Sequence, residues 1–250
     1  MAAVWLIVPT FNEADNLEAI VRAALPQLAT ATPDHHILVV DDASPDGTGE
    51  IADQLAAELA PVEVVHRETK HGLGRAYLTG FDRALRAGAD LVLEMDADFS
   101  HDPADLPRLI EAAEDADLAL GSRYVAGGAV VDWGIQRRLL SRGGSLYART
   151  VLGVPVRDLT GGFKCFRREV LMRLDLTRVH TDGYAFQIEL TYRALAAGFR
   201  VREVPIVFHE RRAGTSKMSS GIAFEAVWKV AALRLRQGLR RAEYPPRARM

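Results

Sequence analysis

The sequence has one cysteine, no long apolar run and neither of the common glycine-rich phosphate-binding motifs. A single cysteine excludes a disulfide framework and a multi-cysteine metal site, so Cys165 is expected to serve in packing. No segment has the roughly 20 apolar residues of a transmembrane helix, and no secretion signal is expected at Met1. Because Gly-x-Gly-x-x-Gly and Gly-x-x-x-x-Gly-Lys-Ser/Thr are absent, a dinucleotide-dependent dehydrogenase and a P-loop NTPase are disfavoured.

The 250 residues, with 48% hydrophobic and 26% charged, fit one α/β domain. Short apolar runs typical of strands alternate with helix-like segments. The expected strands are Val4–Pro9, Ile37–Asp41, Val62–His66, Leu91–Met95 and Leu118–Gly121, and the helices are expected to begin at Glu13, Thr48, Leu73 and Pro103. This alternation predicts a mostly parallel sheet flanked by helices on both faces, with the ligand beyond the carboxyl ends of the strands.

The segment from Val92 to Asp98 reads as a buried strand that ends in two carboxylates. Because side chains alternate along a strand, Asp96 and Asp98 point the same way and can share a hard divalent cation that also binds phosphate oxygens. An isolated Asp-x-Asp is more often a polar strand exit before a helix, here the one that Pro103 opens. Polar motifs at the ends of the other strands favour the metal-diphosphate interpretation.

The net charge of −2 hides a basic C-terminus, since eight Lys and Arg stand against two Glu from Lys217 onward. The stretch Ile222–Leu239 places Phe224, Trp228 and Leu235 near one helical face with basic residues around them. Such a helix can lie on an anionic membrane or dock on its own sheet, and the segment alone supports both equally. We expect a catalytic domain over 1–217, this amphipathic helix over 218–243 and a disordered tail over 244–250.

Motifs along nearly the whole chain closely resemble glycosyltransferase family 2 and, within it, the dolichol-phosphate (polyprenol-phosphate) mannose synthases. The motifs that carry the resemblance are Pro9-Thr10-Phe11-Asn12-Glu13, Val40 to Thr48, Gly72-Leu73-Gly74, Met95 to His101, Gly121 to Tyr124, Asp158 to Phe163 and Gly214 to Lys217. The resemblance implies a GT-A (Rossmann-like) fold, GDP-mannose as donor, Mg²⁺ or Mn²⁺, and a polyprenyl phosphate acceptor in a membrane.

The resemblance also implies roles for individual residues. The nucleoside would be held by Pro9, Phe11, Glu13, Val40 and Asp42. The diphosphate and metal would be surrounded by Asp96, Ala97, Asp98 and Ser100. Phosphate-binding cations would be Arg123, Arg211 and Lys217, with Arg137 and Ser141 on one face of a helix expected over Gln136–Val151. Two departures stand out, because some relatives carry Gln at the position of Ser100 and many carry C-terminal transmembrane helices that this chain lacks.

The chemistry expected of such a protein needs no general base, because a phosphate monoester with a second pKa of about 6 is already anionic at neutral pH. Direct attack on the donor sugar inverts its anomeric configuration. The predicted function is an inverting polyprenyl-phosphate β-mannosyltransferase that works peripherally on the cytoplasmic face of an anionic membrane. A separate membrane-anchoring subunit or fused domain is a further expected partner, and nucleic acid is not.

Several alternatives stay open on the sequence alone. The donor can be UDP-glucose or another nucleotide sugar, and a non-catalytic subunit of a membrane glycosylation complex can share the fold. For the cations, the ordinary alternative is a solvated surface charge. Gln187 and Glu189 match sugar-facing positions of the family but are equally consistent with a buried, satisfied helix pair. Asn12 and Asp46 are expected to cap turns, and the seven histidines, including His101, to be surface or loop residues.

Overall fold

The computed structural model describes residues 2–179, 181–211 and 228–235. The strands are β1 (Val4–Thr10), β2 (His35–Asp41), β3 (Val62–His66), β4 (Leu91–Glu94), β5 (Leu118–Ser122), β6 (Ala129–Val130), β7 (Lys164–Arg167), β8 (Val201–Pro205) and β9 (Val207–Phe208). The helices are α1 (Leu17–Ala31), α2 (Thr48–Glu58), α3 (Leu73–Arg86), α4 (Leu106–Asp115), α5 (Ile135–Leu152), α6 (Arg168–Arg173) and α7 (Gly183–Ala196). There are also two short 3-10 helices, η1 (Pro103–Asp105) and η2 (Leu176–Arg178), among the described residues, and residues 228–235 are helical.

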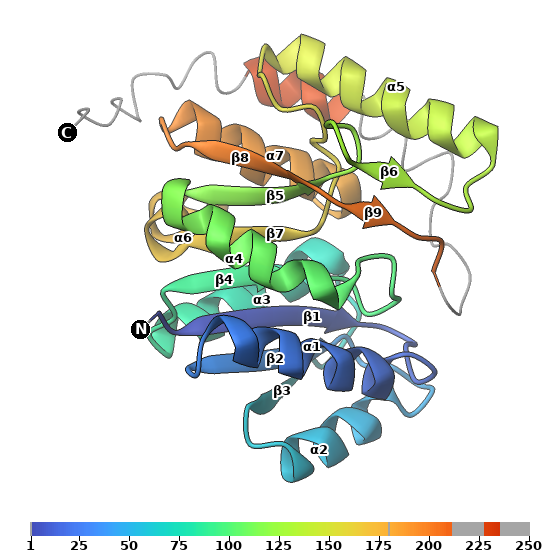
Figure 1. The fold of residues 1–250 in the computed structure, drawn as a ribbon, viewed down its shortest axis with the longest axis vertical. Coiled ribbons are helices and arrows are strands. Elements are labelled where there is room, and N and C mark those ends of the chain that lie inside the picture. Colours follow the sequence, from blue (N-terminus) through green and yellow to red (C-terminus); the bar gives the residue numbers. More distant parts are fainter. Residues whose placement is uncertain (1, 180, 212–227, 236–250) are drawn as a thin grey trace.

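A seven-stranded sheet in the order β3-β2-β1-β4-β7-β5-β8 forms the centre of the molecule. Among its described strands β7 alone runs antiparallel, between β4 and β5. The two-stranded pair β6-β9 lies beyond one end of this sheet (Figure 1). The predicted mostly parallel sheet is therefore confirmed.

Helices cover both faces of the sheet, as predicted. One core cluster joins the sheet to α1, α2 and α4, and a second joins it to α3, α6 and α7 (Figure 1). All seven residues of β1 are buried. This explains why its sequence is a continuous apolar run rather than an alternating one, since both faces are covered. Cys165 is buried in the core, and burial raises the pKa of its thiol, which fits the expected packing role.

Some predicted boundaries are wrong. The helix expected from Glu13 begins at Leu17, because Glu13 belongs to a turn whose carbonyl accepts hydrogen bonds from the amides of Asn16 and Leu17. The helix expected at Pro103 starts with one 3-10 turn before α4. The strand expected to reach Met95 ends at Glu94, so the paired carboxylates lie in the loop that follows β4. The helix expected over Gln136–Val151 is confirmed as α5.

The C-terminal helical segment 228–235 is packed onto the domain rather than free of it. Val230 is buried and Leu233 packs in a cluster with residues of α5 and α7, while Arg234 donates hydrogen bonds to the Leu152 carbonyl and the Tyr192 hydroxyl. Trp228 remains 69% exposed. The segment thus docks by one side and keeps a large aromatic side chain at the surface. Phe224 and the rest of the expected helix lie outside the described residues.

Gly80 of α3 sits against β1, and its lack of a side chain permits the close approach. A Cβ there would lie 2.4 Å from Cγ2 of the buried Ile7. We predict that Gly80→Ala lowers the free energy of unfolding by about 1–3 kcal/mol, because overpacking outweighs the better helix propensity of alanine. Denaturant unfolding measures the change. Gly143→Ala in α5, where a Cβ meets nothing within 4 Å, is the control and should stabilise by about 0.5–1 kcal/mol. Equal stabilisation by both variants would contradict the close approach.

Candidate active site

A cavity of about 410 Å³ lies beyond the carboxyl ends of the parallel strands. Residues from distant parts of the chain meet in it. The lining that the sequence predicted consists of Pro9, Phe11, Glu13, Asp42, Asp96, Ala97, Asp98, Ser100, Arg123, Arg137 and Arg211. The position of this cavity is the one expected for ligands of a parallel α/β sheet.

The paired carboxylates occupy the floor of this cavity. Asp98 Oδ1 accepts a hydrogen bond from the Ser100 amide at 3.0 Å, and Asp98 Oδ2 lies 3.2 Å from Arg211 Nη2. Asp96 accepts a hydrogen bond from the hydroxyl of the buried Tyr77 at 3.3 Å. Burial and the neighbouring charge of Asp98 raise the pKa of Asp96 to about 7. Two crowded carboxylates of this kind are stabilised by a cation.

The chemistry of this donor set fits a hard divalent metal. Within the described residues no group of three or more His, Cys, Asp or Glu side chains could enclose a metal on its own. Mg²⁺ is commonly held by only one or two carboxylates, with substrate phosphates and water completing its coordination. Asp96 and Asp98 supply such a pair, and the Ser100 hydroxyl belongs to the same lining.

The Arg123 guanidinium forms an ion pair with the buried carboxylate of Asp158. Its Nε and Nη2 donate to the two oxygens of Asp158 at 2.7 Å each, and Nη2 also donates to the Thr160 hydroxyl at 2.7 Å. Burial alone would raise the pKa of Asp158, but the charge and hydrogen bonds of Arg123 outweigh it and hold this pKa below its usual value. Arg123 therefore anchors the β5 exit to the 158–160 loop, and its contact with a substrate phosphate stays a prediction.

Two other predicted cations, Arg137 and Arg211, also have carboxylate partners. Arg137 Nη1 donates to Glu210 at 2.7 Å and its guanidinium stacks on the Trp133 ring, 4.1 Å from the centroid. Arg211, the residue after Glu210, reaches Asp98. The 210–211 segment thus joins α5 to the carboxylate loop. Lys217 lies outside the described residues.

Three other predicted residues are placed differently. Val40 packs in the core with 0% exposure and is not part of the cavity lining, so its nucleoside contact stays a prediction. Asp42 lines the cavity but accepts hydrogen bonds from Arg67 and from the amides of His71 and Gly72. Ser141 is absent from the described lining, and its hydroxyl accepts a hydrogen bond from Tyr124 at 2.6 Å.

The structure resolves the alternative left open for Glu189. Its carboxylate accepts hydrogen bonds from Thr181 at 2.6 Å and from Arg193, and both Glu189 and Arg193 are buried. Arg193 also donates to the carbonyls of Leu174 and Arg178. The pair therefore fixes the loop before α7 and is a satisfied structural pair. The expected cap at Asp46 is also confirmed by its hydrogen bonds to the Thr48 amide and hydroxyl.

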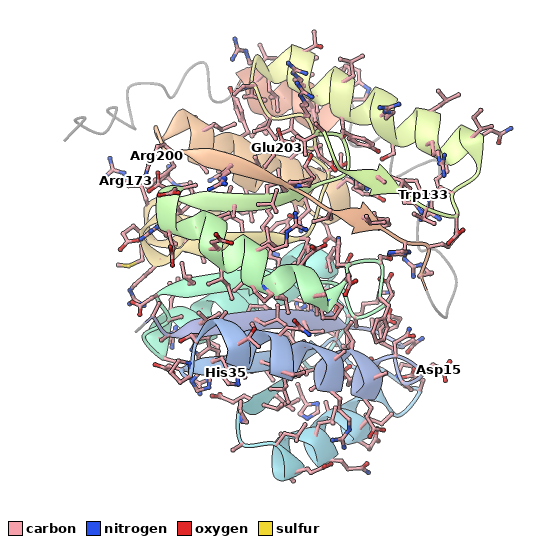
Figure 2. All side chains as sticks on the ribbon, viewed as in Figure 1. Asp15, His35, Trp133, Arg173, Arg200 and Glu203 are labelled. Carbon is pink, nitrogen blue, oxygen red and sulfur yellow. The ribbon has the colours of Figure 1, made fainter. Side chains whose placement is uncertain are left out.

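Sequence reasoning missed part of the lining. His101, expected to be a surface or loop residue, lies in the loop after β4 but not at the surface. It is 2% exposed and stacks on Phe163, and burial lowers its pKa to about 4. Its position directly after the carboxylate motif was the available signal. Other lining residues that the sequence did not single out include Lys70, Trp133, Asp182, Tyr184 and Phe208. Trp133 comes from the loop between β6 and α5 (Figure 2), Tyr184 from the first turn of α7 and Phe208 from β9, and the tertiary fold brings them together.

Comparisons with known proteins agree with this geometry. A model of the family described as "Glycosyl transferase family 2" matches residues 5–175. Two solved structures have the same fold at low identity. Glucosyl-3-phosphoglycerate synthase from Mycobacterium tuberculosis, in complex with Mn²⁺, UDP-glucose and phosphoglyceric acid, has a TM-score of 0.66 at 20% identity, covering 98% of this chain and 81% of that one. Mannosyl-3-phosphoglycerate synthase from Rubrobacter xylanophilus also has a TM-score of 0.66, at 22% identity, covering 96% and 75%.

Two relatives are far more similar in sequence. The polyprenol monophosphomannose synthase of Mycolicibacterium smegmatis is 52% identical over 239 residues, which is 95% of this chain and 89% of that protein. The undecaprenyl-phosphate mannosyltransferase of Micrococcus luteus is 48% identical over 245 residues, 94% of this chain and 99% of that protein. Fold, cavity and sequence together define a glycosyltransferase. The chain belongs to glycosyl transferase family 2.

The Arg123–Asp158 pair provides a stability test. We predict that Asp158→Asn costs about 3–5 kcal/mol of unfolding free energy at pH 7, because it leaves a guanidinium buried without its counter-charge. Since the folded pKa of Asp158 lies below its unfolded value of about 3.9, its stabilisation is present above that value and is lost as pH falls through the folded pKa. Denaturant unfolding between pH 7 and pH 2 measures both effects, and the variant should lose less stability on acidification.

The matched control is Glu58→Gln, which breaks the exposed ion pair with Arg22. It should change stability by no more than about 1 kcal/mol. Similar losses in the two variants would show that burial of the Arg123 pair has no energetic weight.

Proposed function

We propose that this protein transfers mannose from GDP-mannose to a polyprenyl phosphate, with inversion at the anomeric carbon and with the help of Mg²⁺ or Mn²⁺. The observation that carries the proposal is one cavity with carboxylates on its floor and Arg137 and Arg211 at its side. Such a site accommodates a metal-bound diphosphate and an anionic acceptor together. The names of the relatives at 52% and 48% identity support mannose and polyprenyl phosphate as the transferred sugar and acceptor.

In the proposed reaction an acceptor phosphate oxygen attacks the anomeric carbon of the donor. The bond from this carbon to the diphosphate oxygen breaks, and GDP leaves with the electron pair. The acceptor is already anionic, so the protein has to position it rather than deprotonate it. Arg137 and Arg211 bring the acceptor phosphate to the donor and offset its charge.

Asp96 and Asp98 would hold the metal. The nucleoside would be held by Pro9 in β1 and by Phe11 and Glu13 in the segment that follows it. When bound, a divalent cation offsets the charge of the departing diphosphate. The lysine stacked on the Phe11 ring, Lys70, lies 3.7 Å from the ring centroid and belongs to the same lining. It adds a positive charge on the nucleotide side of the cavity.

The first test removes one expected metal ligand. Asp98→Ala should lower transfer of radiolabelled mannose to polyprenyl phosphate by at least about 100-fold and abolish the gain in GDP-mannose affinity that Mn²⁺ gives. Calorimetry with and without Mn²⁺ measures the second effect independently of turnover. The control is Asp115→Ala, which changes an exposed aspartate at the end of α4. Wild-type turnover in Asp98→Ala would refute the metal-diphosphate assignment.

We also propose that α5 rests on the membrane that contains the acceptor. Ile135, Leu139 and Leu146 are 75%, 65% and 62% exposed, and their spacing of four and seven residues places them on one stripe of the helix. Arg142 lies within that stripe, and the exposed Trp228 belongs to the helical segment packed beside α5. Apolar side chains flanked by arginines are typical of helices in an anionic membrane interface. Among the described residues no helix meets the length and hydropathy needed to cross a bilayer.

The second test concerns this surface. Leu139→Ser combined with Trp228→Ser should reduce co-sedimentation with liposomes that contain anionic lipid by about tenfold, because two apolar anchors are lost. Met172→Ser is the control, since Met172 is 63% exposed on α6. Co-sedimentation that is insensitive to the double variant and to salt would contradict membrane contact through this face.

A further inference from the structure

Three buried polar side chains lie directly beneath the cavity floor, and the transfer chemistry does not use them. Glu94 and Lys164 are 0% exposed and face each other across β4 and β7, and Gln187 of α7 is 2% exposed. Gln187 reaches the cavity lining, whereas the other two do not. Burying a carboxylate, an ammonium and an amide costs free energy unless these groups pair or form hydrogen bonds with one another.

The Lys164 ammonium fixes one end of the Gln187 side chain. It donates to the Gln187 carbonyl at 2.9 Å and to the side-chain oxygen Oε1. An ammonium cannot accept a hydrogen bond, so Oε1 must face Lys164 and the Nε2 amide nitrogen must face away from it. The amide orientation is therefore set by the charge of its neighbour.

Glu94 completes this arrangement from the adjacent strand. Its Oε2 lies 4.0 Å from Lys164 Nζ, within ion-pair range, so the buried carboxylate and the ammonium offset each other's charge. The Gln187 Nε2 atom, which points away from Lys164, has no hydrogen-bond partner of regular geometry within the described part of the chain. Its hydrogens therefore remain for an acceptor.

The space beside Nε2 belongs to the cavity. A Cβ on Gly162 would lie 3.3 Å from Gln187 Nε2 and 4.0 Å from Asp96 Oδ2, so the absence of a side chain at Gly162 leaves a gap next to both groups. A donor amide and an acceptor carboxylate flank this gap. A sugar hydroxyl, which both donates and accepts, is the chemical group that matches the pair.

Gln187 matches a sugar-facing position of the family, and we propose that Glu94 and Lys164 are positioning residues that hold its amide with the nitrogen toward the cavity. Held in this way, the amide selects among donor hexoses by binding a hydroxyl beside Asp96. The inference rests on the proposed function, because it assumes a nucleotide-hexose donor. Hydrogen bonds to a substrate hydroxyl discriminate strongly when a mismatched sugar leaves the buried amide unpaired.

The experiment compares two epimeric donors, GDP-mannose and GDP-glucose, by their ratio of kcat/KM. The variant is Glu94→Gln/Lys164→Met, which removes both charges together and so leaves no unpaired ion. The ratio should fall by about tenfold or more, whereas calorimetric affinity for GDP with Mn²⁺ should stay within about threefold, since GDP has no hexose. A folded double variant with wild-type discrimination would overturn the proposal.

Gln187→Leu tests the proposal independently if the double variant does not fold. It removes the amide itself and should lose the same discrimination between donors. Thr191→Val is the structural control. It removes a hydrogen bond of 3.1 Å to the Gln187 carbonyl but leaves the amide in place, so it should lower thermal stability and keep the ratio. Loss of discrimination in Thr191→Val as well would reduce Gln187 to a packing role. Failure of the wild type to use either donor would instead overturn the proposed function.

Discussion

The concentration of negative charge at the end of β4 is the constraint on which the site depends. Glu94, Asp96 and Asp98 follow one another at every second residue, and the first of them is completely buried. Burial and mutual repulsion raise the pKa of Glu94 and of Asp96 to about 7. Two cations offset this charge. Lys164 on the neighbouring strand β7 lies within ion-pair range of Glu94, and Arg211 lies within ion-pair range of Asp98.

The antiparallel strand β7 makes this compensation possible. Inserted between β4 and β5, it places Lys164 opposite Glu94 in register. Because β7 is itself a strand of the sheet, Lys164 lies next to Glu94 in the core without having to extend inward from the surface. The same insertion brings the loop that precedes β7, with Thr160 and Gly162, to the cavity. The strand that runs antiparallel within the described sheet thus supplies the buried cation and follows one wall of the site.

The sequence predicted the architecture and the carboxylate floor because both are encoded locally. Buried runs of five to seven residues and polar strand exits are readable without tertiary information. The roles of Ser141, Glu189 and His101 depend on contacts with Tyr124, Thr181 and Phe163, which the tertiary fold creates. The spacing of residues in the sequence does not reveal such contacts. The same holds for Trp133, in the loop between β6 and α5, and for Tyr184, in the first turn of α7.

The paired state of the site cations has a consequence for how polyanionic substrates bind. Glu210 and Arg211 are adjacent and reach in different directions, to Arg137 on α5 and to Asp98 on the floor. If these arginines bind the substrate as proposed, a diphosphate or phosphate would replace a protein carboxylate on an arginine that is already ordered. Exchange of this kind avoids immobilising a mobile side chain, which itself costs free energy on binding. The two contacts come from adjacent residues, so a single peptide unit joins α5 to the carboxylate loop.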